Sequence, residues 1–444
     1  MKNCSVFDYG AKGDGTTLDT VAIQNAIDDC SNNGGGRVTL SSGNFLFGRI
    51  DLKDGVELHL ERDAVLLGSK DVSDFPEIDT NFWRTEYAPR FNKRCYIYAE
   101  GAKDIAITGR GTIDCQGSAF VDPCSEEEIN NRPHMSFKRK QFPLPEGVTA
   151  DPNLVAMVGT NPHPLDPKIT SLAPARVILM IGCENVLMED ITIKNQPAGW
   201  STWITDCEDV HFHRLRITSA LDFPNCDGLH INCCRNVTVS DCNIRTGDDC
   251  IVVRAYSAPL YKNTKCEGVT VTNCNFKSHT AGIRIGWIGD GEMRNFTFSN
   301  LTITESISGI LMRLPPNPHS ARMADQGFEE PFIENISFSN ITIDRNYMSP
   351  IRIEIENHSP CKAIQNIYFS DIHAFSARMP EIKGRSDVHL KNIYFNNCHF
   401  RQIQYEDIGT KFSERMVKIN RQITPPVFTC VDNLVLNGTT FDLL

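Results

Sequence analysis

The chain has 444 residues, of which 41% are hydrophobic and 22% are charged, and its formal net charge is −11. This composition excludes wholesale disorder, and the acidic balance argues against nucleic acid or an anionic membrane surface as the main partner. No stretch approaches the ~18 apolar residues of a membrane span, and the N-terminal sequence MKNCSVFDYGAKGDG contains no apolar signal region. The 17 cysteines lack zinc-type spacing, so we expect a cytoplasmic protein with reduced, buried thiols.

One helix is predicted near the N-terminus. The segment DTVAIQNAIDDCSNNGGG has helical periodicity, with Asp19 or Thr20 as the N-cap and a run of glycines as the stop signal. We expect this amphipathic helix to cover the open end of a strand-rich body and to protect its edge strand, within an N-terminal cap of about residues 1–50.

A short phrase, typified by ENVLMEDITI and RNVTVSDCNI, repeats from about residue 185 onward, with an earlier copy at 103–113. Each copy alternates apolar and polar residues, which is the signature of a strand. The apolar residue that follows Asn, Asp or Gly recurs at positions 186, 210, 237, 269, 296, 336, 367, 393 and 434. Repeats built only of short strands and turns predict an all-β fold, a right-handed parallel β-helix, in which residues 1–444 form a single domain.

Two stretches without the repeat interrupt the predicted coils, at about residues 115–174 and 314–332, and both are rich in proline, asparagine and charge. Long insertions on a rigid scaffold are usually functional. We expect them to close one end of a binding groove.

A second column of strands lies between the repeated phrases, at 200–204, 228–231, 250–253, 282–286, 309–313, 350–355 and 381–384. Alternation along these strands turns one set of side chains inward and the other outward. The outward set consists of His230, Arg284, Leu311, Arg313, Arg352, Glu354 and Lys383. This mostly cationic row is either a solvated charged face or a surface that holds an acidic ligand.

Three aspartates stand at the heads of two consecutive strands of this column. NCDGLHI places Asp227 before one strand, and GDDC places Asp248 and Asp249 before the next, 21 to 22 residues later. One coil of separation brings the three carboxylates together, because strands stack about 4.8 Å apart. Repulsion then raises at least one pKa, which supplies a proton donor beside a base, as glycosidic bond hydrolysis requires.

Three alternatives remain open at this stage. Asp-Gly and Gly-Asp pairs are ordinary turn residues, although three aspartates at equivalent positions favour a functional site. Hard oxygen ligands also suit calcium, so a calcium-dependent polysaccharide lyase with Arg284 as its base is possible on the same scaffold. The third alternative is a carbohydrate-binding β-helix without catalytic activity.

The motifs VFDYGAKGDGTTLDTVAIQNAID, ITGRGTIDCQG, NCDG and GDDC resemble those of the polygalacturonase family, glycoside hydrolase family 28, over nearly the whole chain. The resemblance implies an inverting hydrolase in which Asp248 is the general acid, while Asp227 and Asp249 position and deprotonate the water. It implies neither a cofactor nor a metal, and its partner is an oligosaccharide.

The chain departs from the family pattern at the positions that grip the sugar. Ala281 stands where the family has a histidine, with His279 two residues earlier, and Leu311 and Arg313 stand where the family has arginine and lysine. Arg284 replaces a small polar residue. Because arginine suits a sugar carboxylate, we expect a pectin-derived or related oligosaccharide that contains uronic acid as the substrate, cleaved from one end. The alternative is a neutral or deoxy sugar, with Leu311 as an apolar contact. The predicted substrate-binding residues are Asn225, His230, His279, Arg284, Arg313, Arg352 and Lys383. Trp83, His134, Trp200 and Trp287 are further candidates, each of them more typical of packing than of ligand contact.

Overall fold

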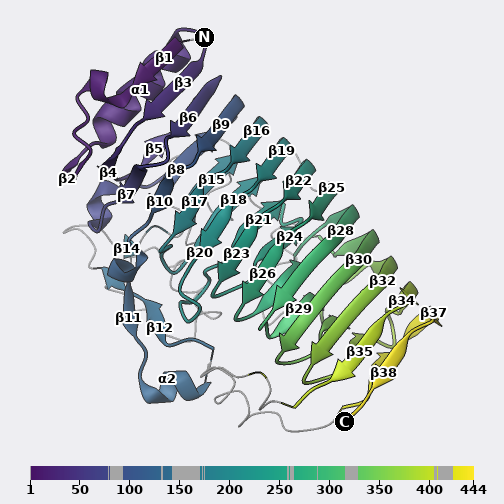
Figure 1. The fold of residues 1–444 in the computed structure, drawn as a ribbon. Coiled ribbons are helices and arrows are strands. Elements are labelled where there is room, and N and C mark those ends of the chain that lie inside the picture. Colours follow the sequence, from purple (N-terminus) through teal and green to yellow (C-terminus); the bar gives the residue numbers. More distant parts are fainter. Residues whose placement is uncertain are drawn as a thin grey trace.

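The computed structural model describes residues 2–78, 94–131, 134–142, 176–257, 265–287, 289–315, 329–404 and 424–444, together with residues 80, 171, 172, 174, 260 and 408. Its strands wind into a stack of parallel coils that runs from the N-terminal to the C-terminal end (Figure 1). This is the predicted right-handed parallel β-helix. No helix in these ranges is long and apolar enough to cross a membrane.

The coils are formed by two extended sheets, one of 23 strands and one of 11 strands in the described part of the chain. The larger sheet bends within each coil, so its strands fall into two stretches. The first stretch contains β1 (Lys2–Ser5), β3 (Gly36–Leu40), β6 (Val56–Leu60), β9 (Lys103–Gly109), β16 (Glu184–Glu189), β19 (Glu208–His213), β22 (Arg235–Ser240), β25 (Lys265–Thr272), β34 (Leu390–Asn396) and β37 (Val431–Asn437).

The second stretch contains β2 (Asp14–Leu18), β4 (Gly43–Phe47), β7 (Ala64–Gly68), β10 (Thr112–Asp114), β17 (Thr192–Lys194), β20 (Arg216–Thr218), β23 (Asn243–Thr246), β26 (Asn275–Ser278), β35 (His399–Gln402) and β38 (Thr440–Asp442). Three long strands run through both stretches: β28 (Glu292–Thr304), β30 (Phe332–Asn346) and β32 (Ala363–Ser376).

The 11-stranded sheet is the predicted second column. Its strands are β5 (Ile50–Asp51), β8 (Cys95–Glu100), β15 (Arg176–Ile181), β18 (Trp200–Thr205), β21 (Leu229–Asn232), β24 (Ile251–Arg254), β27 (Ala281–Ile285), β29 (Ser308–Leu314), β31 (Ile351–Ile355), β33 (Glu381–Lys383) and β36 (Val427–Thr429). Isoleucines such as Ile231, Ile283 and Ile353 point into the core and are fully buried, as the alternation predicts.

The repeated phrase sets the register of the first stretch. Val186 pairs with Val210, Val210 with Val237, and the pairing continues through positions 269, 296, 336, 367, 393 and 434. The Asn, Asp or Gly that precedes each of these residues is left-handed, with φ between 53° and 70°, a conformation that these residue types tolerate best. Their side chains also form a ladder, since Asn366 donates to Asn335 at 3.0 Å and accepts from Asn392 at 2.8 Å.

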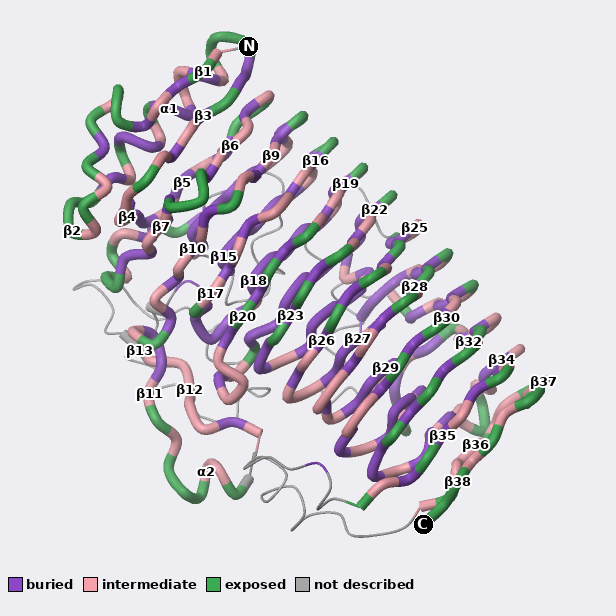
Figure 2. Tube along the Cα trace, viewed as in Figure 1, coloured by how far each residue is buried: buried purple, intermediate pink, exposed green. Residues whose placement is uncertain are grey.

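The predicted N-terminal helix is α1 (Thr20–Asn32), with Asp19 as its N-cap residue. Its apolar face, which includes Ile23 and Ile27, belongs to the core that fills the coils. Figure 2 colours part of this helix as buried. The helix lies at the N-terminal end of the stack (Figure 1) and contacts β1, β3, β5 and β6. Short 3-10 helices occur at Val6–Tyr9, Val72–Asp74 and Gly117–Phe120.

The first insertion contains structure of its own. It includes β11 (Val121–Pro123), α2 (Glu126–Asn131), β12 (Phe137–Arg139), β13 (Gln141–Phe142) and β14 (Ser171–Leu172), with antiparallel pairs β11–β12 and β13–β14. The second insertion starts where β29 ends and stops where β30 begins, and its residues 316–328 lie outside the described residues. All 17 cysteines are free, and all but Cys124 and Cys430 are buried.

Candidate active site

The three aspartates meet at the N-terminal ends of β21 and β24. Leu229 pairs with Ile251 in parallel register, so Asp227 and Asp249 hold equivalent positions on adjacent coils, and Asp248 precedes Asp249. The backbone N–H of Gly228 donates to the carbonyl of Asp249 at 2.9 Å. The predicted separation of one coil is therefore confirmed.

The next coil supplies the partners of these carboxylates. The Thr280 hydroxyl lies 2.7 Å from Asp248 Oδ1 and 2.8 Å from Asp249 Oδ1, so these two oxygens are at most 5.5 Å apart. The backbone N–H of Ala281 donates to Asp249 Oδ1 at 2.9 Å, and Arg284 Nε donates to Asp249 Oδ2. Both oxygens of Asp249 are thus engaged, and the carboxylate is fixed beside a cation.

Burial and mutual repulsion place a proton in this cluster. Burial, followed by the charge of Asp249, raises the pKa of Asp248 to about 6. Burial, with the charges of Asp248 and Asp249, also raises the pKa of Asp227 well above its ordinary value. Both carboxyls therefore bind a proton more readily than free aspartates do, next to the ion-paired Asp249.

Asp227 Oδ1 and Arg284 Nη1 are among the buried polar atoms at the site that have no hydrogen-bond partner within the residues that the structure describes. Asp227 is only 4% exposed, while its backbone carbonyl accepts from Gln196 Nε2 at 2.9 Å. Buried polar atoms are normally paired, so these atoms are suited to a water or a ligand. The site thus combines a proton donor, an acceptor oxygen with spare capacity and a cationic group.

His230 points outward from its strand, as predicted, but it is not exposed. Its ring lies 3.8 Å from the Trp200 ring, centroid to centroid, and it is 3% exposed. Burial and the nearby cations Arg254, Arg176 and Arg284 lower the pKa of His230 well below its ordinary value. With Nδ1 3.8 Å from Asp227 Oδ2, His230 is a neutral neighbour of that carboxylate and not an ion-pair partner.

Trp200 belongs to the same buried stack. The guanidinium of Arg176 lies 3.5 Å from its ring centroid, and Arg176 is 1% exposed. Trp200 therefore packs between Arg176 and His230, the residue next to Asp227.

Asn225 connects the aspartates to the first insertion. Its amide Nδ2 lies 3.4 Å from Asp248 Oδ2, and its Oδ1 accepts from Arg139 on β12 at 3.3 Å. Arg139 also donates to the carbonyl of Ala198. Phe137, on the same strand, packs edge-on against Phe223 with their centroids 5.0 Å apart. The described part of the insertion thus lies against the loop that leads to Asp227.

The cationic row farther along the sheet differs from the prediction, because glutamates neutralise it. Arg313 donates to Glu356, and Arg352 donates to Glu354. Lys383 lies 2.7 Å from Glu354 and 3.0 Å from Glu381. Although burial raises the pKa of Glu354, Lys383 and Arg352 outweigh it and lower that pKa. The glutamates hold these cations in a network, in which Arg352 Nε is the buried nitrogen left without a hydrogen-bond partner among the described residues.

His279 does not occupy the place left by Ala281. It lies beside His134 and the backbone of Leu221, and burial, followed by the charge of His134, lowers its pKa to about 4. Trp287 covers Arg284, with the guanidinium 4.9 Å from its ring centroid. Leu311 is 8% exposed and pairs with Arg284 on the adjacent strand. Trp83 lies outside the described residues.

Sequence reasoning missed Thr280, Gln196, Arg139 and the glutamate partners. Thr280 could have been found, because it stands one coil after Asp248. Glu354 was already assigned to the outward face, and only its pairing was overlooked. Arg139 carries no signal, since it lies in an insertion without the repeat.

Comparisons with known proteins place this geometry in context. Residues 169–417, more than half of the chain, match the model of glycosyl hydrolases family 28, and residues 4–59 match a rhamnogalacturonase A/epimerase, pectate lyase-like model. An exopolygalacturonase structure from Thermotoga maritima superposes with a TM-score of 0.69 at 21% identity, over 100% of this chain and 93% of the other.

Sequence relatives carry related names. A probable polygalacturonase of Vitis vinifera is 26% identical over 70% of this chain and 57% of its own length. An exo-poly-alpha-D-galacturonosidase of Dickeya chrysanthemi is 30% identical over 56% of this chain and 41% of its own. The chain thus spans about half the length of these two relatives. An exopolygalacturonase of Platanus acerifolia is 23% identical over 80% of both chains.

Proposed function

Because the chain belongs to glycosyl hydrolases family 28, we propose that it is a glycosidase that hydrolyses pectin-derived oligosaccharides containing uronic acid, with inversion at the anomeric carbon. The observation that carries this proposal is the cluster of Asp227, Asp248 and Asp249, in which the pKa of Asp248 is raised to about 6 and that of Asp227 is raised, beside buried atoms without a partner among the described residues.

Asp248 serves as the general acid in this proposal. With a pKa raised to about 6, it is protonated in mildly acidic solution and transfers that proton to the glycosidic oxygen as the bond to the anomeric carbon breaks. Asn225, which donates to Oδ2 of the ionised form, stabilises the carboxylate that remains.

Water activation falls to Asp227 and Asp249. Both oxygens of Asp249 are engaged, Oδ1 by Thr280 and the backbone N–H of Ala281 and Oδ2 by Arg284, so this carboxylate is poorly placed to attack carbon itself. Asp227 Oδ1 is open, and the ionised form of Asp227, which must predominate while Asp248 keeps its proton, can accept a proton from a water that attacks the face opposite the leaving group. The Oδ1 atoms of Asp248 and Asp249 lie within 5.5 Å of each other, closer than the ~6.5–9.5 Å usual between the acid and the base of inverting enzymes, which makes the stereochemistry a decisive test of the roles of Asp227 and Asp249.

Arg284 is the sugar-carboxylate receptor in this proposal. It adjoins Asp249 and keeps Nη1 unpaired within the described part of the chain, whereas the cations of β29, β31 and β33 lie farther along the sheet and contact glutamates. Guanidinium groups bind carboxylates through parallel hydrogen bonds. The names of the relatives, which are polygalacturonases, support a galacturonic acid residue as the sugar bound there.

Cleavage from one end of the chain is the finer part of the proposal. Arg139 and Phe137 bring the first insertion against the loop before Asp227, where a wall would limit how far a polymer extends. The relatives named exo-poly-alpha-D-galacturonosidase and exopolygalacturonase agree with this mode of action.

The test is incubation with galacturonate oligomers of two to six residues, followed by separation of the products. We expect galacturonate to be released stepwise, Asp248→Asn to be inactive, and Asp241→Asn, which alters an exposed turn aspartate on the same coil, to be fully active. Equal activity of Asp248→Asn and the parent would refute the assignment of the acid.

A further inference from the structure

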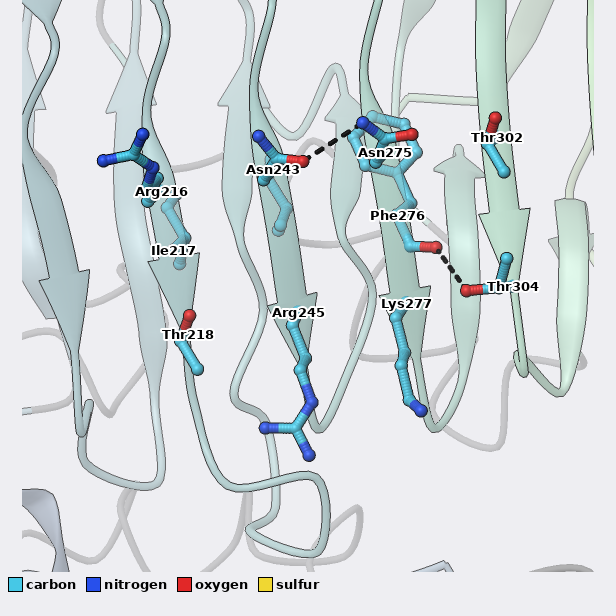
Figure 3. A pocket seen from close by; sticks show the side chains of 11 residues that line it. Arg216, Ile217, Thr218, Asn243, Arg245, Asn275, Phe276, Lys277, Thr302 and Thr304 are labelled. Carbon is cyan, nitrogen blue, oxygen red and sulfur yellow. Dashed lines mark hydrogen bonds between the residues drawn. The ribbon is translucent and has the colours of Figure 1, made fainter. Parts of the chain in front are cut away.

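A groove of about 330 Å³ lies on the outer face of the larger sheet, away from the three aspartates. It crosses four consecutive coils, with walls and floor from β20, β23, β26 and β28 (Figure 3). Its polar lining consists of Arg216, Thr218, Asn243, Arg245, Asn275, Lys277, Thr302 and Thr304. The volume reaches the lower end of the range of small-ligand sites.

The groove is cationic although the chain is acidic. Arg216 and Arg245 are exposed, and no ion pair joins either of them to a carboxylate in the described ranges. The third cation, Lys277, pairs with Glu305 at the edge of the groove. Two open guanidiniums on a chain of net charge −11 form a local field that attracts anions.

Amides and hydroxyls between these cations supply the remaining polar groups. Asn275 Nδ2 donates to Asn243 Oδ1 at 3.1 Å, which leaves the Nδ2 of Asn243 and the Oδ1 of Asn275 directed along the row (Figure 3). Successive coils repeat at about 4.8 Å, and the side chains stand on a rigid sheet. Regularly spaced donors and acceptors with interleaved cations match an oligosaccharide that is rich in hydroxyls and carries carboxylates.

The groove is connected to the catalytic cluster through two short turns. Arg245 precedes Asp248 by three residues, and Lys277 precedes Thr280 by three. Arg245 on β23 and Lys277 on β26 therefore lie on the strands that lead directly into the turns of Asp248 and Thr280.

We propose that this groove is a second, non-catalytic binding site for acidic oligosaccharides, in which Arg216 and Arg245 bind sugar carboxylates and Asn243 and Asn275 bind hydroxyls. The choice of galacturonate as the probe rests on the proposed function, whereas the groove itself does not.

The experiment measures binding of hexagalacturonate by calorimetry in the Asp248→Asn variant, which prevents cleavage. Arg216→Ala/Arg245→Ala is compared with Arg401→Ala, which removes an exposed arginine of β35 on the same sheet outside the groove. Arg216→Glu is a second groove variant. Thermal unfolding of each variant verifies that it is folded.

We expect hexagalacturonate to bind at the groove, and the double variant to weaken that binding at least 10-fold or abolish it. Binding at the catalytic cluster stays unchanged in the double variant, and the Arg401→Ala control binds as its parent does. Raised salt weakens binding at the groove. Neutral maltohexaose does not bind at the groove. The proposal would be overturned if the double variant and its parent bound hexagalacturonate with identical stoichiometry and affinity, or if neither bound it. Equal binding of maltohexaose would also overturn it. Failure of the proposed hydrolysis appears separately, as an absence of cleavage by the parent enzyme.

Discussion

Thr280→Val tests how the acid is tuned. In the parent, the Thr280 hydroxyl lies within hydrogen-bonding distance of Asp248 and Asp249, and it favours the ionised form of Asp248. Valine keeps the branched shape but removes the donor. The ionised form of Asp248 then loses stabilisation, so the pKa of Asp248 rises.

The size of the shift follows from the bond that is lost. A hydrogen bond to a charged group contributes ~1.5–3 kcal/mol, which corresponds to ~1–2 pKa units. Because one hydroxyl proton serves two carboxylates, we expect about one unit for Asp248. From a pKa of about 6, the protonated fraction at pH 7 would rise from ~10% to ~50%.

The assay is kcat/KM for a galacturonate oligomer between pH 4 and pH 8. The parent should lose ~10-fold between pH 5 and pH 7, and Thr280→Val only ~2-fold. Thr270→Val, an exposed threonine of β25, is the matched control and should follow the parent. If the fall of kcat/KM at alkaline pH occurred in Thr280→Val at the same pH as in the parent, or at a lower pH, the hydroxyl would not stabilise ionised Asp248.

The other predictions concern stability and cofactors. The pKa of Asp248 is about 6 in the folded chain against an ordinary 3.8, so the folded state binds more protons and the free energy of unfolding falls as the pH rises from about 4 to about 6. Asp248→Asn should therefore stabilise the protein above pH 6 by up to ~3 kcal/mol and by nothing near pH 4, as thermal unfolding can measure; a gain equal at both pH values would contradict this. Arg284→Met leaves Asp249 charged and buried, so it should cost ~3–5 kcal/mol and abolish activity, with Arg284→Lys milder; an unchanged melting temperature would disprove the role of this ion pair. Asn366→Ala should cost ~1–2 kcal/mol in backbone strain beyond its lost hydrogen bonds, and Asn366→Gly should recover the strain portion; equal melting temperatures for the two variants would exclude strain. A chelator should leave hydrolysis unchanged with no ultraviolet-absorbing product; loss of activity on chelation would instead favour the lyase.

The sequence was sufficient to predict the β-helix because the requirements for each coil fall on neighbouring residues of the chain. Each coil needs an apolar residue inward at every second position and a left-handed Asn, Asp or Gly before it, and both requirements leave a readable pattern. The apolar positions that recur from Val186 to Leu434 are the ones that pair in register. The same reasoning placed Asp227 one coil before Asp249.

The surroundings of the aspartates were beyond that pattern, because they depend on contacts between segments without a fixed spacing. Glu356 reaches Arg313 across 43 residues, and Arg139 arrives from an insertion. Alternation correctly turned His230 outward, yet it could not reveal that Trp200 covers the ring. A period-two pattern gives the direction of a side chain but not its partner.

The stereochemistry of hydrolysis tests the central claim most directly. Proton NMR during cleavage of an α-linked galacturonate oligomer identifies the anomer that is released first. If Asp248 is the acid and a water held by Asp227 and Asp249 is the nucleophile, the β anomer appears first and the α anomer grows only by mutarotation. The α anomer appearing first would contradict the account and would instead assign Asp227, with its open oxygen, as the nucleophile of a retaining enzyme.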